Sequence, residues 1–314
     1  MAERRLALLA LGLGGLVALF LLWQLRAPAG FILSLRAAKL GALLLVGAAT
    51  GAATVLFQTV AANRLLTPGI VGFDALFVFL QTALVLALGG VGYAALPGMA
   101  SFLAETACLM GAAMALFGAL LRRGADDVVR MILTGVILGV LLRGLAGFAQ
   151  RVLEPSEFAI VQAASFATFG AVDPGQLAIA ALVLAAALAG ALRLAPALDV
   201  AALGRVRART LGLAHDRLVL AALGLVAAMV SVATALVGPI TFLGLLAAAL
   251  ARAAVGTDAH ARLLPAAALT GALILVAGQT LFERLLGMQS TLAVIVEFAG
   301  GLLFLALVLR RRPA

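Results

Sequence analysis

Four ionisable residues lie inside apolar stretches that are long enough to cross a membrane: Asp74, Glu105, Arg143 and Glu297. Charged groups at membrane depth are costly, so they indicate an ion pair or a transport pathway. Glu105 and Arg143 come from neighbouring stretches and could pair with each other, whereas the sequence identifies no partner for Glu297. Acids of this kind are what a proton-coupled carrier needs, so a secondary transporter is one candidate function.

Other residue patterns argue against chemistry carried out by this chain. The sequence has no Gly-x4-Gly-Lys-[Ser/Thr] phosphate loop and only one lysine, so ATP would have to be hydrolysed by another subunit. It has no nucleophile elbow and no paired carboxylates. His215 and His260 stand apart, beside Asp216 and Asp258, and are weak candidates for metal ligands. We therefore expect no catalytic residue, no metal site and no bound cofactor.

The composition determines the class of protein that holds these residues. Of 314 residues, 65% are hydrophobic and 11% are charged, and the mean hydropathy is +1.22, values typical of a polytopic membrane protein. The net charge of +9 does not indicate nucleic-acid binding, because the arginines lie at the ends of apolar runs with few aromatic residues between them. Cys108 is the only cysteine, which excludes a disulfide within the chain.

Ten apolar runs predict ten transmembrane helices, because about 20 residues cross the hydrocarbon layer. The runs are Leu6–Trp23, Leu40–Ala62, Val71–Gly90, Ser101–Leu121, Met131–Ala149, Gln176–Leu192, Leu218–Val237, Ile240–Val255, Leu263–Phe282 and Leu292–Leu309. We interpret the first run as an uncleaved span, although Ala27-Pro28-Ala29 could imitate a signal-peptidase site. Ile240–Val255 is barely long enough and is expected to be tilted or partly re-entrant. Gly47 and Gly51, and likewise Gly135 and Gly139, have a spacing that favours close helix contacts.

The arginines predict the orientation, because inner loops are enriched in basic residues. With the amino terminus inside, both termini are cytoplasmic and most arginines fall on the inner side. A short helix, Ser156–Phe166, is expected in the longest outer segment. The outer bases Arg36, Lys39 and Arg284 are exceptions to this rule and indicate a docking partner with acidic residues. The alternative is that they contact lipid phosphates.

The basic segment Pro196–Ala214 is the predicted point of contact with another protein on the inner side. Glycines at 204 and 212 interrupt it, so we expect two short helices, Ala197–Leu203 and Val206–Leu211. Arg205 and Arg209 lie four residues apart, on one side of the second helix. The alternative is a solvated loop whose arginines only set the orientation.

Several blocks in the second half of the chain resemble a known family. Gly238-Pro239-Ile240-Thr241-Phe242-Leu243-Gly244-Leu245, Ala251-Arg252, Gly256-Thr257-Asp258 and Leu263-Leu264-Pro265 are similar to the GPI-x-F-x-GL, AR, G-[ST]-D and LLP blocks of permease subunits of ABC importers for iron-siderophores and cobalamin. The resemblance runs from Leu35 to Arg312. It implies an all-α, type II ABC importer permease architecture with about ten spans, one domain over residues 1–314, and a two-fold dimer with the pathway along its interface.

The resemblance also implies roles for individual residues. Arg36 and Lys39, in a stretch similar to the family's LRLPR, and Arg284 would dock the substrate-binding protein through salt bridges. Asn63 and Leu65 resemble the cytoplasmic gate. The ATPase-coupling residues would be Leu203, Gly204, Arg205, Ala208, Arg209, Leu211 and Gly212, with Arg205 in place of the family's usual acid. For the translocation path, which should be wide and carry few polar groups, our own candidates for the lining are Met131, Thr134, Gly135, Leu138 and Ser165.

The expected function is that of a permease in the bacterial inner membrane that imports ferric siderophores, in the branch for catecholate or mixed siderophores. Its expected partners are an ATPase dimer that uses ATP and Mg²⁺, a periplasmic or lipid-anchored binding protein, a second permease subunit and membrane lipid, with no nucleic acid. Two other functions stay open: a proton-coupled secondary transporter, and a membrane scaffold or insertase without transport.

Overall fold

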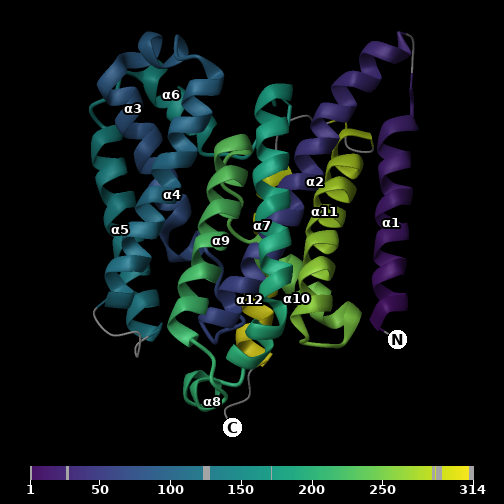
Figure 1. The fold of residues 1–314 in the computed structure, drawn as a ribbon. Helices are drawn as coiled ribbons and strands as arrows, with labels where there is room; N and C mark the ends of the chain where they lie inside the picture. The colour runs from purple at the N-terminus through teal and green to yellow at the C-terminus, as the bar shows by residue number, and fades with distance from the viewer. Residues whose placement is uncertain are drawn as a thin grey trace.

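A computed structural model describes residues 2–25, 28–122, 128–170, 172–284, 287 and 292–310. Within these ranges every regular element is a helix, and the helices stand side by side as one bundle (Figure 1). They are α1 (Ala2–Leu22), α2 (Ala29–Val60), η1 (Gly69–Phe73), α3 (Asp74–Ala94), α4 (Gly98–Arg122), α5 (Val128–Gln150), α6 (Pro155–Ala164), α7 (Pro174–Ala201), α8 (Arg205–Thr210), α9 (His215–Val237), α10 (Leu243–Val255), α11 (His260–Arg284) and α12 (Leu292–Arg310).

All ten predicted runs form helices, in the predicted order. In the described residues, eight helices are long and apolar enough to cross a membrane, and two apolar helices, α10 and Ala293–Ala306 within α12, are shorter. α10 has 13 residues, which corresponds to about 20 Å, less than the hydrocarbon thickness of about 30 Å. It begins only at Leu243, after the non-helical segment 238–242, so it is shorter than the predicted run Ile240–Val255. The expected all-α, multi-span fold class is confirmed.

Most helices extend a few residues beyond the apolar runs that predicted them, and α2 and α7 extend furthest. α2 begins at Ala29 rather than Leu40, so Arg36 and Lys39 lie on the helix itself and not in a loop. α7 continues through Pro196 to Ala201, and the expected separate helix Ala197–Leu203 is therefore wrong. Hydropathy marks the part of a helix that lies in lipid, whereas helix formation continues wherever leucine and alanine still favour it. The second predicted short helix is confirmed as α8.

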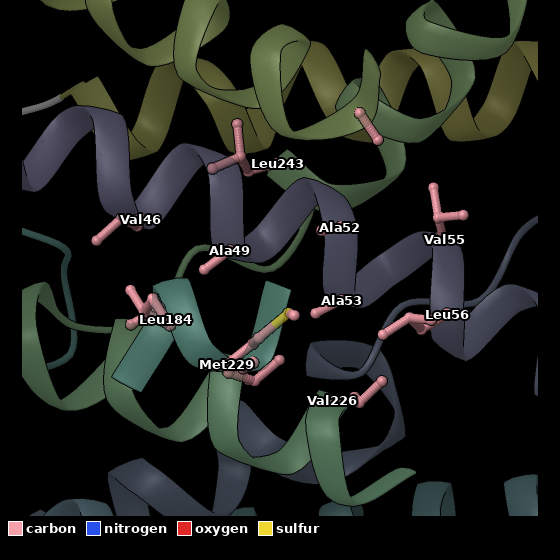
Figure 2. Close-up of a cluster of buried hydrophobic side chains, with 14 of the residues drawn as sticks. Val46, Ala49, Ala52, Ala53, Val55, Leu56, Leu184, Val226, Met229 and Leu243 are labelled. Atoms are coloured by element: carbon pink, nitrogen blue, oxygen red, sulfur yellow. The ribbon is translucent and has the colours of Figure 1, made fainter. Parts of the chain in front are cut away.

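The centre of the bundle is formed by α2, which is buried along most of its length. Figure 2 shows Ala49 and Ala53 of α2 in one apolar cluster with Leu184 of α7 and with Val226 and Met229 of α9. On another face, α2 lies directly against α11. A Cβ atom on Gly47 would be 2.6 Å from the Ala272 nitrogen, so glycine is required for this contact.

The remaining predicted glycine contacts are also confirmed. Gly51 faces Ala267 of α11, whereas Gly135 and Gly139 of α5 face Val71 and Gly72 of η1. Small residues allow these helix backbones to approach closely, since large side chains would separate them. The contact between α5 and η1 holds the irregular segment that precedes α3.

The two ends of the bundle differ. The start of α1, the end of α12 and the whole of α8 lie at one end, here called the α8 end (Figure 1). α6, the start of α2 and the last turns of α11 lie at the opposite end, the α6 end. α6 confirms the predicted helix Ser156–Phe166, and it starts with a capping box formed by Glu154 and Glu157.

Candidate functional site

The expected gate residues lie in a tight turn after α2, at the α8 end. The backbone N–H of Asn63 donates to the Gln58 carbonyl at 3.1 Å, and the Asn63 side-chain oxygen accepts from the Leu65 N–H at 3.0 Å. Both side chains are half-buried. The turn is therefore held by its own short-range hydrogen bonds. Residues 61–66 are called the gate loop below.

A ring of polar side chains attaches the gate loop to the end of α10. Gln58 donates to the Arg64 carbonyl at 2.7 Å and accepts from Arg252 at 2.7 Å. Asp258 completes the ring, because it accepts from Arg64 at 2.9 Å and lies 3.6 Å from the Arg252 Nε. Arg252 and Asp258 belong to the sequence blocks that carry the family resemblance, and the structure shows that they hold the gate loop.

A second polar contact connects three helices behind the gate loop. Asp199, in the last turn of α7, accepts from the backbone N–H of His260 at 2.8 Å and lies 2.5 Å from His260 Nδ1. The other ring nitrogen, Nε2, is 2.7 Å from the hydroxyl of Thr59 in α2. His260 is 3% exposed, whereas the Asp199 side chain is 41% exposed, so the ring is buried and the carboxylate reaches the surface. This contact joins α7, α11 and α2 through one imidazole ring.

A cavity of about 230 Å³ separates the gate loop from the turn between α7 and α8. Asn63 and Arg64 line it on one side, and Ala201, Ala202 and Gly204 line it on the other. Gly204 has φ 95°, a left-handed backbone that favours glycine, and it sets the direction in which α8 leaves the bundle. Asn63, from the expected gate, and Gly204, from the expected coupling residues, thus border the same cavity, whereas Leu65 is not among the residues that line it.

α8 presents an exposed surface of apolar and basic side chains. Leu203, Val206 and Leu211 are 52%, 78% and 65% exposed, and Arg207 is exposed between them. Ala208 points inward and is fully buried. The turn ends at Gly212, which also has a positive φ of 82°. Such a surface at the end of a membrane bundle is typical of a protein contact.

Arg205 and Arg209 contact their own chain, whereas Arg207 is exposed. Both guanidinium groups contact Asp216 in the first turn of α9, at 3.4 and 2.6 Å. The prediction that they share one side is confirmed, but that side faces α9. These two arginines therefore orient α8 on its own chain.

The three expected docking bases lie together at the α6 end, in unequal environments. Arg36 is 9% exposed, and its guanidinium donates to the carbonyls of Leu21, Trp23 and Gln24 at 2.6, 3.0 and 3.3 Å. Because the last carbonyls of a helix have no partner within it, Arg36 closes the end of α1. Its charge is thus committed to its own chain.

Lys39 and Arg284 remain half-buried at the same end. Lys39 forms an ion pair with Glu283 at 2.5 Å, and Glu283 also accepts from Gln279 at 2.7 Å. Arg284 is near enough to Arg36 for the two charges to repel each other. The structure thus brings the three bases together and adds Glu283, an acid that we did not single out from the sequence.

The structure brings two of the expected path residues together. Gly135 and Leu138 of α5 both line an apolar cavity of about 60 Å³ beside η1, where Gly135 is buried against Val71. Thr134 is half-buried and does not line this cavity. The side chain of Met131 lies outside the described residues. At the α6 end, the Ser165 hydroxyl donates to the Val161 carbonyl at 2.8 Å, which satisfies the last turn of α6.

The ionisable groups within the spans do not form the pair that we considered. Glu105 is buried beside Gln81, which also accepts from the Tyr93 hydroxyl at 2.7 Å. Arg143 is exposed and acts electrostatically on Asp74.

The structure also gives Glu297 the neighbours that the sequence did not identify. It lies near Asp74 and accepts from the backbone of Thr241, whose hydroxyl donates to Asp74 at 2.6 Å. In the described part of the chain, no three His, Cys, Asp or Glu residues come close enough to hold a metal ion.

Sequence reasoning missed Asp199 and Thr59. Asp199 is the only acid between Asp173 and Asp216, a signal that could have singled it out. Thr59 gives no such signal, because threonine is common in apolar helices. His260 does not contact Asp258, the acid nearest to it in sequence. Its ring faces α7 and contacts Asp199 instead.

Comparisons with known proteins address the family and the fold. Residues 6–310 match the model of the FecCD transport family. The chain is 33% identical to the petrobactin import system permease protein YclO of Bacillus subtilis, over 90% of each chain, and 34% identical to the petrobactin import system permease protein FatC of Bacillus anthracis, over 82% of this chain and 73% of that one. A solved inward-facing structure of a metal-chelate type ABC transporter has the same fold, with a TM-score of 0.86 at 22% identity over 99% of this chain and 100% of that one.

Proposed function

The chain belongs to the FecCD transport family, and we propose that it is the permease subunit of an ATP-driven importer for ferric siderophores. The subunit carries out no covalent chemistry. It provides a passage whose opening at the α8 end is controlled by the gate loop, and it takes energy from a separate ATPase.

The observation that carries this proposal is the position of α8. This helix lies outside the bundle, and Val206 on it and Leu203 and Leu211 beside it are exposed. The turn that leads into it, at Ala201, Ala202 and Gly204, borders the same cavity as the gate loop. An exposed apolar surface in water is unfavourable unless a partner covers it. An ATPase that binds this surface could move α8 and change the gate without contacting the cargo.

The partners and the orientation follow from the two ends. The α8 end faces the cytoplasm of a bacterium, where the two termini lie and where an ATPase dimer binds ATP and Mg²⁺. The α6 end faces outward and receives a siderophore-binding protein. Its acidic residues contact Arg284 and compete with Glu283 for Lys39. A second permease subunit completes the passage, for which Thr134, Leu138 and the neighbouring positions of α5 are the proposed lining. No cofactor is bound by this chain.

The cargo class is proposed from the relatives. YclO and FatC are named as petrobactin import permeases, which supports a ferric siderophore as the cargo here. A ferric chelate already encloses its metal, so the passage needs no metal ligands of its own.

The test is uptake by a reconstituted complex. The permease and its ATPase are reconstituted in proteoliposomes. Radiolabelled ferric petrobactin is supplied with the binding protein on one side of the membrane, and ATP and Mg²⁺ are supplied on the opposite side, where the ATPase lies. We expect uptake that requires ATP, the binding protein and an ATPase with an intact phosphate loop. Uptake driven by a proton gradient without the ATPase, and abolished by Glu297→Gln, would instead establish a secondary transporter. A chain that binds no ATPase and transports nothing would be a scaffold.

A further inference from the structure

Asp199 joins the last turn of α7, which leads into α8, to the first residue of α11. It lies five residues before Gly204, where the chain turns into α8. Its carboxylate accepts from the first N–H of α11 at 2.8 Å and contacts the His260 ring at 2.5 Å. A displacement of α8 that pulls on α7 therefore acts on α11 through a charged hydrogen bond.

The contact between His260 and Thr59 reaches α2, the helix that precedes the gate loop. Asp199, His260 and Thr59 are together called the bridge below. His260 Nε2 is 2.7 Å from the Thr59 hydroxyl, and the same hydroxyl lies 2.9 Å from the Val55 carbonyl. Thr59 has one proton to donate, so it either donates to Val55 and accepts from an imidazolium, or it donates to a neutral ring. In both cases the ring connects Asp199 to the last turn of α2, directly before Asn63 and Leu65.

The cavity gives this bridge its mechanical importance. The turn at Ala201, Ala202 and Gly204 faces Asn63 and Arg64 across about 230 Å³ of space, so the two segments have room to move relative to each other. Hydrogen bonds are directional, so three contacts around one buried imidazole ring hold Asp199 and Thr59 in one geometry. The bridge borders the cavity, since both Thr59 and His260 line it.

We propose that Asp199, His260 and Thr59 are positioning residues that transmit the movement of α8 to the gate loop. The inference rests on the proposed function and deepens it, because it names the route within this chain from the ATPase contact to the gate. A contiguous network between two sites becomes a coupling route only when its loss separates their movements. The test must therefore measure both sites.

The experiment uses the complete complex in proteoliposomes and compares uptake with ATP hydrolysis. In Asp199→Ala and Thr59→Val we expect the ATPase to remain bound and active, while siderophore uptake per ATP falls about tenfold, a typical coupling factor. Thr59→Ser keeps the hydroxyl and should transport like the parent. Asp173→Ala is the matched control, because Asp173 caps the other end of α7, with contacts of 2.8 and 3.1 Å to Gly175 and Gln176.

A second measurement follows the gate loop itself. In a Cys108→Ala background, Ala62→Cys places one thiol in the gate loop, on a residue that lines the cavity. Its rate of labelling by a water-soluble maleimide should change on ATP binding in the parent and in Asp173→Ala, but not in Asp199→Ala or Thr59→Val. A purely structural role of the bridge would lower the yield of the complex and leave this ATP-dependent change in place.

The outcomes separate the two proposals. Normal uptake per ATP and a normal ATP response in both Asp199→Ala and Thr59→Val would overturn the coupling route. If Asp199→Ala does not assemble, the comparison of Thr59→Val with Thr59→Ser decides, since it removes one hydroxyl from a helix. A parent complex without ATP-dependent uptake would instead contradict the proposed function.

Discussion

At the scale of single residues, charge by itself does not identify a docking group. Arg36, Lys39 and Arg284 carry the same charge and lie at the same end of the bundle, yet each has a different environment. Arg36 closes the end of α1, Lys39 is paired with Glu283, and Arg284 lies near Arg36. Their contributions to stability and to docking should therefore separate experimentally.

Arg36→Gln should mainly affect stability. The variant loses charged hydrogen bonds to the carbonyls of Leu21 and Trp23, and bonds to charged groups contribute about 1.5–3 kcal/mol each. We expect a lower midpoint of thermal unfolding in detergent, followed by tryptophan fluorescence. Arg284→Gln, the control, should keep the parent midpoint and weaken capture of the binding protein. Equal midpoints for both variants would contradict the assignment of Arg36 to α1.

On α8, substitutions of Arg207 and of Arg209 should have different effects. Arg207 is exposed, whereas Arg209 contacts Asp216 at 2.6 Å. Arg207→Glu should reduce co-purification of the ATPase without changing stability. Asp216→Arg should disturb α8 by repelling Arg205 and Arg209, and the double variant Asp216→Arg with Arg209→Glu should restore binding. Since exposed ion pairs contribute about 0–1 kcal/mol, the readout is ATPase binding and not unfolding. Loss of binding in the double variant would argue against the orienting role of Asp216.

At the scale of elements, the bundle depends on how closely α2 and α11 approach. Helices in lipid gain little from the hydrophobic effect, so their contact depends on van der Waals packing between small residues. Gly47 lies where a Cβ atom would meet the backbone of Gly271 and Ala272. The same amino acid elsewhere has no such requirement, because nothing lies within 4 Å of a Cβ atom on Gly14 of α1.

Gly47→Ala should accordingly destabilise the protein, although alanine is the better helix former. Overpacking costs about 1–3 kcal/mol, which exceeds the gain of about 1 kcal/mol that alanine brings to a helix. Gly14→Ala, the matched control, should be neutral or slightly stabilising. Thermal unfolding of the two variants in the same detergent measures the difference. A stabilised Gly47→Ala variant would mean that α2 and α11 can separate without cost.

At the scale of the whole molecule, the two ends of the bundle should lie on opposite sides of a membrane. Single thiols in a Cys108→Ala background test this. Ser156→Cys on α6 should react with an impermeant maleimide in intact spheroplasts, whereas Thr210→Cys on α8 should react only after permeabilisation. The expectation follows from the arginine distribution and from the position of α6 and α8 at opposite ends (Figure 1). Labelling of Thr210→Cys in intact spheroplasts would reverse the orientation.

Much of the fold could be predicted because a bilayer imposes simple rules. A span needs about 20 apolar residues with its backbone hydrogen bonds satisfied internally, so hydropathy alone located ten helices in the correct order. Helix ends were less predictable: α2 and α7 continue past their apolar runs, since alanine and leucine favour helix in water as well as in lipid. The short run Ile240–Val255 indicated that α10 would be an irregular span.

The sequence by itself determined the class, the order of the spans and the family, because these depend on local composition and on short motifs. Only the tertiary structure decided which partner each charged group has. Asp199 meets His260 from 61 positions away, Arg252 meets Gln58 from 194, and Arg36 meets the end of the preceding helix. Such pairings depend on how helices rotate and pack against one another, and linear spacing carries no record of that rotation.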